Sequence, residues 1–206
     1  MAIYHGFTEG AAALWRGGRY ETRMDAMLFL AAAAMLVALA ERWPMLTLAA
    51  VPVAALAGTT LPDLDLALGL GHRSGLTHSV LPILLAAARP RWWSVAAGLA
   101  LGIGLHLSAD VFPNAMRGFA TVKLPGAGSI GRGGSWAWLA INAVAALAIG
   151  TLLLRRIASG RAAAVLLAIV GGLGVAYLFV TDGGWPALLI YGGSGWALVR
   201  RRAIGA

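Results

Sequence analysis

Apolar runs separated by short polar breaks occupy most of the chain. A helix needs about 17 to 25 mostly apolar residues to cross the hydrocarbon core of a bilayer, and most of these runs approach or reach that length. The pattern predicts an all-α fold, a polytopic transmembrane helix bundle with six to seven membrane-embedded helices. The predicted helices cover Asp25–Ala40, Met45–Leu61, Thr77–Ala88, Trp93–Phe112, Ser135–Leu154, Ala162–Val180 and Trp185–Val199.

The run Thr77–Ala88 is the shortest and decides the topology. Because each helical residue adds about 1.5 Å, this run can cross only by extending back through Gly75 and forward to Arg89. A re-entrant segment is the alternative. We expect a crossing, since seven spans place the polar ends of Met45–Leu61 and Trp93–Phe112 on the same side of the membrane.

One integral membrane domain with three regions is expected along the chain. Residues 1–24 lack the apolar core and cleavage site of a signal peptide and are predicted to form a surface or amphipathic lead-in. Residues 25–125 carry the polar motifs within transmembrane segments, and residues 126–206 supply C-terminal transmembrane helices. The Gly-rich stretch Asn114–Gly134 is predicted to be a mobile loop, and a lid is one possible role.

Composition supports the bilayer as the solvent of this chain. Only 12% of the residues are charged, 60% are hydrophobic, and the mean hydropathy is +0.79, values typical of integral membrane proteins. The net charge of +8 does not indicate nucleic-acid binding, because the basic residues form short clusters that flank apolar runs, as in membrane proteins. The expected partner is therefore membrane lipid, and the pattern leaves the oligomeric state open.

The scarce ionisable groups concentrate in LPDLDLALGLGHRSGLTHS, Leu61 to Ser79. Pro62 disfavours a helix that continues through Leu61, so Asp63 and Asp65 should lie at a helix end near the membrane interface. In an extended segment, residues two apart point the same way, which would aim both carboxylates at one ion. A solvated turn is the alternative interpretation.

The same segment continues with His72 and His78, whose imidazoles suit both metal ligation and proton transfer. Arg73 lies between them and could bind a phosphate or carboxylate through two hydrogen bonds, or it could be a flanking charge. Thr77 and Ser79 are expected to orient neighbouring side chains or to cap a helix, with Thr77 as the N-cap of a helix that begins there.

The segment LHLSAD places His106 and Asp110 inside a long apolar run. Their spacing of four residues puts both side chains on one helical face, and ionisable residues within membrane segments are costly enough to indicate a functional site. The alternative is a buried His106–Asp110 pair in which the two side chains satisfy each other's hydrogen bonds. One metal site would explain all six residues together: Asp63, Asp65, His72, His78, His106 and Asp110.

The chain contains no cysteine, so a bound metal must use histidine and carboxylate ligands. This ligand chemistry suits a divalent metal, with zinc the first choice and manganese the second. Asp182, in a short turn, would share the side of the site and is an accessory candidate ligand. Trp136, Trp138 and Trp185 are expected to anchor helices at the membrane interface.

The motifs LPDLD, GHRSGLTHS and GLHLSAD resemble, in order and wording, those of the LexA-regulated, YdjM-like family of membrane-bound metal-dependent hydrolases. The motifs of that family read approximately LPDID, HRGxTHS and HxxxD, and the resemblance covers about Asp25 to Pro125. It implies a bacterial inner-membrane hydrolase in which the same six residues form the metal site, with Arg73, Thr77 and Ser79 beside them.

The predicted function is hydrolysis of a lipid or lipid-linked substrate at the membrane interface by metal-activated water. Either Asp65 or Asp110 would act as the general base, and Arg73 would stabilise negative charge in the transition state. Two alternatives remain from the sequence. A transporter or channel could use a His/Asp site, and a non-catalytic membrane protein could use the cluster as a structural metal clip.

Overall fold

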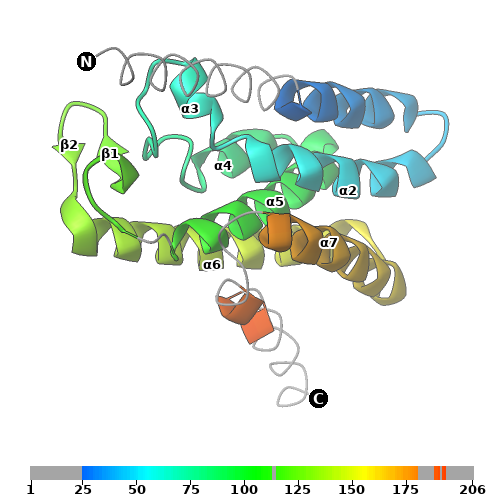
Figure 1. Ribbon diagram of the computed structural model, residues 1–206. Helices are drawn as coiled ribbons and strands as arrows, with labels where there is room; N and C mark the ends of the chain where they lie inside the picture. Colours follow the sequence, from blue (N-terminus) through cyan, green and yellow to red (C-terminus); the bar gives the residue numbers. More distant parts are fainter. Residues whose placement is uncertain (1–24, 113–114, 181–187, 191, 194–206) are drawn as a thin grey trace, which may run out of the picture.

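The chain folds into a bundle of apolar helices with a small hairpin at one end (Figure 1). A computed structural model of the protein describes residues 25–112, 115–180, 188–190 and 192–193. The predicted helical class is confirmed, since the only strands among these residues are two short ones. The elements are the helix Asp25–Leu39, α2 (Met45–Thr60), α3 (Leu64–Ala67), α4 (Leu81–Ala87), η1 (Pro90–Trp92), α5 (Trp93–Asp110), η2 (Gly118–Ala120), β1 (Lys123–Leu124), β2 (Gly128–Ser129), α6 (Gly131–Ile157) and α7 (Gly160–Val180).

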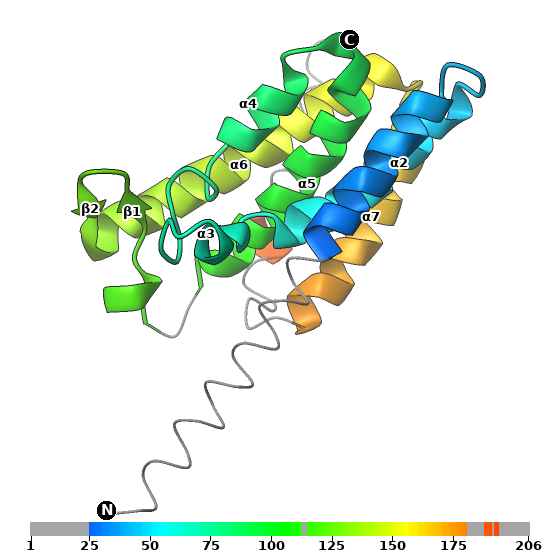
Figure 2. The same cartoon turned by 90° about the horizontal axis from the view of Figure 1, so that it is seen from above.

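Helix α5 is the centre of the bundle and lies between α2 and α6 (Figure 2). Its apolar residues face all directions, and every residue from Ser94 to Ser108 is buried, as expected for a helix enclosed by others. Gly104 packs against Leu147 of α6 and Gly174 of α7 packs against Leu105. The C-terminal helices therefore share a core with the region that carries the motifs.

Small residues allow α2 and α5 to approach closely, as in many membrane helix pairs. Gly98 lies against Val51 and Ala54, and Gly102 lies against Ala55. The later residue of α5 contacts the later residue of α2, so the two helices run parallel. Their C-terminal ends consequently meet, and the segment through α4 and η1 returns the chain to the beginning of α5.

Three described helices are long and apolar enough to cross a membrane: Pro90–Asp110, Gly131–Ile157 and Gly160–Phe179. The helices Asp25–Leu39 and Met45–Thr60 are apolar but shorter, so the predicted six to seven spans are not confirmed. The predicted helix Thr77–Ala88 is reduced to the seven residues of α4, which rise only about 10 Å. It does not cross a membrane as a helix, although its segment still brings the polar motifs to one end of the bundle.

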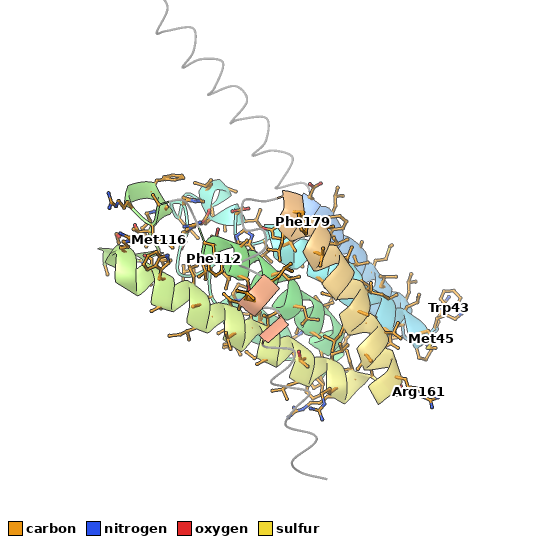
Figure 3. The ribbon with its side chains drawn as sticks, turned by 60° about the horizontal axis from the view of Figure 1, so that its bottom comes forward. Trp43, Met45, Phe112, Met116, Arg161 and Phe179 are labelled. Carbon is orange, nitrogen blue, oxygen red and sulfur yellow. The ribbon has the colours of Figure 1, made fainter. Side chains whose placement is uncertain are left out.

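The two ends of the bundle differ in structure (Figure 3). One end, here called the hairpin end, holds α3, the β-hairpin and the C-terminal ends of α2 and α5. Met116 and Phe112 lie there. The other, the arginine end, holds the 40–44 turn, η1 and the α6–α7 link, and Trp43, Met45 and Arg161 lie at this end.

The predicted loop Asn114–Gly134 contains more structure than its glycine content indicates. It holds η2, the hairpin and the first turn of α6, and the backbone N–H of Val122 donates to Ser135 Oγ at 2.9 Å. Several predictions fall outside the described residues, namely the lead-in 1–24, Asp182, Trp185 and most of Trp185–Val199.

Candidate metal centre

Three of the predicted ligands converge at the hairpin end. Asp63 follows α2, His78 lies in the loop after α3, and His106 lies near the end of α5. One ligand atom from each lies within 4.8 Å of the other two, so this group could hold a metal ion. Residues from three separate segments therefore meet at one point, as the single-site interpretation expected.

The spacing of the ligand atoms suits a small divalent cation. His106 Nε2 lies 3.8 Å from Asp63 Oδ1 and 3.6 Å from Asp110 Oδ2, and His78 Nε2 lies 3.3 Å from Asp110 Oδ2. In a tetrahedral zinc site with bonds of about 2.1 Å, neighbouring ligand atoms are separated by roughly 3.4 Å. The separation between the candidate ligands His106 and Asp63 is close to that value.

Three of these four atoms lack hydrogen-bond partners among the described residues. Nε2 of His78, Nε2 of His106 and Oδ2 of Asp110 are buried, and none makes a hydrogen bond of acceptable geometry among the described residues. Buried polar atoms are nearly always satisfied, so such atoms need an explanation. A cation held by the two imidazole nitrogens would satisfy both of them and would face Asp110 Oδ2, which is why their chemistry fits a metal.

The opposite nitrogen of each imidazole is held by an oxygen. His106 Nδ1 lies 2.8 Å from the carbonyl oxygen of Thr59, which can only accept, so Nδ1 carries the proton. The Thr77 hydroxyl donates to Ser74 O, and its oxygen can therefore accept from His78 Nδ1 at 3.1 Å. Nε2 is then the nitrogen that each histidine can offer to a metal once that atom carries no proton, the tautomer that metal binding needs.

Asp65 lies beside the group and contacts one of its histidines. Its side chain is fully buried, its Oδ2 accepts from the Ser74 N–H at 3.0 Å and lies 3.5 Å from His78 Nδ1. The expectation of an extended segment is wrong here, because Leu64–Ala67 forms a helical turn. Residues two apart on a helix point in nearly opposite directions, so Asp63 and Asp65 are not aimed at the same point.

Asp65→Asn should weaken zinc binding about 10- to 100-fold without unfolding the protein. The amide would remove the negative charge beside His78 Nδ1, and loss of such a partner typically costs a metal site that much affinity. Competition with a chromogenic zinc chelator would measure the change, with Asp25→Asn as the control because Asp25 is exposed. Equal affinity of Asp65→Asn and wild-type protein would contradict this role.

Arg73 holds Asp110 in place. Its Nη2 donates to Asp110 Oδ1 at 2.7 Å and its Nη1 donates to the Ala120 carbonyl at 2.7 Å. Only 6% of the residue is exposed, and its backbone adopts a left-handed φ of 56°, a conformation that non-glycine residues adopt at an energetic cost. With Oδ1 occupied by Arg73, Asp110 directs Oδ2 toward the two histidines.

His72 lies near the group but is not part of it. Its ring stacks on Phe119 with centroids 4.3 Å apart, and its centroid is 6.4 Å from that of His78. Burial lowers the pKa of His72 below its ordinary value, while the nearby Asp65 carboxylate acts in the opposite direction. The structure therefore places this imidazole beside the centre, at the face covered by η2.

Thr77 and Ser79 differ from the predicted capping arrangement. Helix α4 begins at Leu81 with Val80 as its N-cap, so Thr77 does not cap it. Pro82 lacks an N–H and fits the first turn of a helix, which accounts for the later start. Ser79 Oγ instead accepts from the Leu81 N–H at 3.2 Å, and Thr77 serves His78 as described above.

The loop that carries His78 is fixed by contacts to the hairpin and to α6. Gly75 N–H donates to Lys123 O at 2.8 Å, and Trp138 Nε1 donates to the His78 carbonyl at 2.8 Å. The Lys123 ammonium donates to carbonyl oxygens of His72, Phe119 and Thr121, and burial lowers its pKa. Trp138 thus positions the site, whereas the sequence indicated only an interfacial anchor.

Tyr177 is a site residue that sequence reasoning missed. Its hydroxyl lies 2.9 Å from His106 Nδ1, so α7 contributes to the same centre as α2 and α5. The available signal was a phenol within an otherwise apolar run, since a buried tyrosine hydroxyl usually has a polar partner. The Thr59 carbonyl left no such signal, because any residue type supplies a backbone oxygen.

Comparison of the chain with protein-family models, with curated proteins and with solved structures finds no match in any of the three. The resemblance to the membrane-bound metal-dependent hydrolases therefore stays a prediction, and the site is interpreted from its own geometry.

Proposed function

We propose that the protein is a metal-dependent hydrolase of the bacterial inner membrane that acts on a lipid or lipid-linked substrate. The observation that carries the proposal is the convergence of Asp63 with the buried, unpartnered Nε2 atoms of His78 and His106, which Asp110 Oδ2 faces. A structural His–Asp pair that forms its own hydrogen bond does not account for two imidazoles whose Nε2 atoms face carboxylates without a hydrogen bond. Two histidines with carboxylates and no cysteine favour zinc, with manganese second.

Asp63, His78 and His106 would hold the ion. When bound, a divalent metal supplies a Lewis acid and lowers the pKa of water toward neutrality. A set of three protein ligands would match catalytic zinc sites, whereas structural zinc sites use four.

Asp110 is the general base in this proposal. Its Oδ2 lies 3.3 and 3.6 Å from the two metal-facing nitrogens, so it can accept a proton from the attacking water beside the ion. Its Oδ2 faces both nitrogens and makes no hydrogen bond among the described residues, whereas Asp65 Oδ2 accepts from the Ser74 N–H. Arg73 then acts through Asp110 by orienting it, since both its terminal nitrogens are already engaged.

A lipid substrate follows from the position of the centre at helix ends. The 16 residues of α2 rise about 24 Å, less than the roughly 30 Å thickness of the hydrocarbon core. A helix of this length that begins at one interface ends about 6 Å short of the other, so the centre at the end of α2 would lie just below the headgroups. Exposed apolar side chains surround it, with Leu68 at 65%, Leu76 at 38% and Phe119 at 54% exposure, and these can enter the lipid interface.

Asp110→Asn should retain zinc but lower the rate of lipid hydrolysis about 10²- to 10⁴-fold, the usual contribution of general base catalysis. Detergent-purified protein would be loaded with zinc and assayed against a panel of phospholipids and lipid-linked phosphoesters, esters and amides. Asp25→Asn is the matched control, because it removes an exposed carboxylate elsewhere.

Two results would contradict the proposal. Loss of zinc from Asp110→Asn would make Asp110 a ligand and exclude it as the base. A zinc-loaded wild-type protein that cleaves nothing in the panel but passes zinc across liposome membranes would indicate a transporter, the alternative that the His/Asp motifs left open.

A further inference from the structure

The arginine end carries a strong positive charge. Among the described residues, six arginines are exposed there against a single acidic residue, Glu41, which pairs with Arg91 at 3.0 Å. They come from the turn after Asp25–Leu39, from the α4–α5 connection and from both sides of the α6–α7 link. The six are Arg42, Arg89, Arg91, Arg155, Arg156 and Arg161.

The hairpin end is balanced in charge among the described residues. Four aspartates lie at this end, Asp25 at the start of the first described helix and the three of the metal centre. Of its four basic residues, Arg73 and Lys123 are turned inward onto Asp110 and backbone carbonyls. Only two basic side chains are exposed there, Arg117 and Arg132.

Aromatic side chains accompany the arginines at the level of a membrane interface. Trp43 is 60% exposed beside Arg42, and the Arg156 guanidinium lies 5.6 Å from the centre of the Trp93 ring. Arginine and tryptophan together are typical of helix ends at the interface. The cytoplasmic leaflet carries the anionic lipids that attract basic clusters, and short basic connections stay on that side.

We propose that the arginine end binds anionic headgroups of the cytoplasmic leaflet, so that the metal centre opens at the opposite, outer leaflet. The 18 residues of α5 rise about 27 Å between the two ends, so the centre cannot reach both leaflets. The consequence for the substrate rests on the proposed hydrolase function. It narrows the substrate class to lipids or lipid-linked headgroups carried in the outer leaflet.

The absence of cysteine from the chain permits a direct test of sidedness in the full-length protein. Ala127→Cys places one thiol in the exposed hairpin, and Ser159→Cys places one in the exposed α6–α7 link. A membrane-impermeant maleimide would be applied to right-side-out spheroplasts of a bacterial host, before and after permeabilisation. We expect Ala127→Cys to react in intact spheroplasts and Ser159→Cys to react only after permeabilisation, with wild type as the unlabelled blank.

The reverse pattern, labelling of both thiols from outside, or labelling of neither before permeabilisation would overturn the proposal. The zinc content of both variants separates this result from the hydrolase proposal. Retained zinc with reversed labelling overturns the sidedness alone, whereas the expected labelling in a protein that binds no zinc overturns the metal-dependent function alone.

A charge variant tests whether the arginines set the orientation. In the Ser159→Cys background, Arg155, Arg156 and Arg161 would be replaced together by glutamine. We expect partial labelling of the thiol in intact spheroplasts, because fewer positive charges then retain this end of the bundle in the cytoplasm. Labelling confined to permeabilised spheroplasts, as in the parent, would overturn the role of these arginines.

Discussion

Replacing either His78 or His106 by alanine should remove stoichiometric zinc from the purified protein. Each substitution deletes one of two buried nitrogens that face the centre without a hydrogen bond, and the imidazole and carboxylate that remain are too few for a tight zinc site. Affinity should fall more than about 100-fold, beyond the loss expected for a residue that only orients a ligand. Metal content by mass spectrometry of detergent-purified protein measures the effect.

His72→Ala is the matched control for both variants. It removes the same chemical group from the same end of the bundle, but His72 stacks on Phe119 and lies outside the group that could hold an ion. We expect its zinc content to equal that of the wild type. Loss of zinc in all three variants would support the six-residue site predicted from the sequence over the smaller centre described here.

Metal removal gives an independent measurement of the same centre. A metal that binds only the folded protein stabilises it by about 2.7 kcal/mol when present at 100 times its dissociation constant. Chelation should therefore lower the midpoint of thermal unfolding of the wild type and of His72→Ala. The midpoints of His78→Ala and His106→Ala should not change on chelation, since these proteins have no bound metal to lose.

Most helix positions could be predicted because apolar runs and their breaks have direct physical causes. Pro62 separates α2 from the acidic motif, and α2 ends at Thr60, one residue before the predicted end. The four-residue spacing of His106 and Asp110 correctly placed both on one face, with His106 Nε2 3.6 Å from Asp110 Oδ2. These features depend only on local chain geometry.

The remaining features depend on packing that a single sequence does not specify. Whether Asp65 joins Asp63 depends on a short helical turn, α3, within a segment rich in leucine and glycine. His72 could not be separated from His78 by type or spacing, because the distinction arises from the hairpin, which fixes the loop through Lys123 and Gly75. Tyr177 enters the site only because α7 packs beside α5.

Gly102→Ala should destabilise the whole bundle and weaken metal binding at the same time. A Cβ atom at this position would lie 2.0 Å from the Ala55 carbonyl oxygen and 2.8 Å from Gly58 Cα. Backbone atoms cannot move aside as a flexible side chain can, so α2 and α5 must separate. Overpacking of this kind typically lowers the free energy of unfolding by about 1 to 3 kcal/mol.

The metal centre should respond because it lies one helical turn beyond this contact. Gly102 meets Ala55, and His106 meets the Thr59 carbonyl at 2.8 Å four residues further along both helices. Separation of the helices therefore removes the acceptor that holds the His106 ring, and zinc affinity should fall by about the 10- to 100-fold typical of lost orienting contacts.

Gly172→Ala provides a control with the opposite expected sign. Gly172 lies within α7, and a Cβ there would meet nothing within 4 Å, so alanine should raise helix stability by up to about 1 kcal/mol and leave zinc affinity unchanged. Denaturant unfolding in detergent and zinc competition would be measured for both variants. If Gly102→Ala matched Gly172→Ala in either measurement, close α2–α5 packing would not be what positions His106.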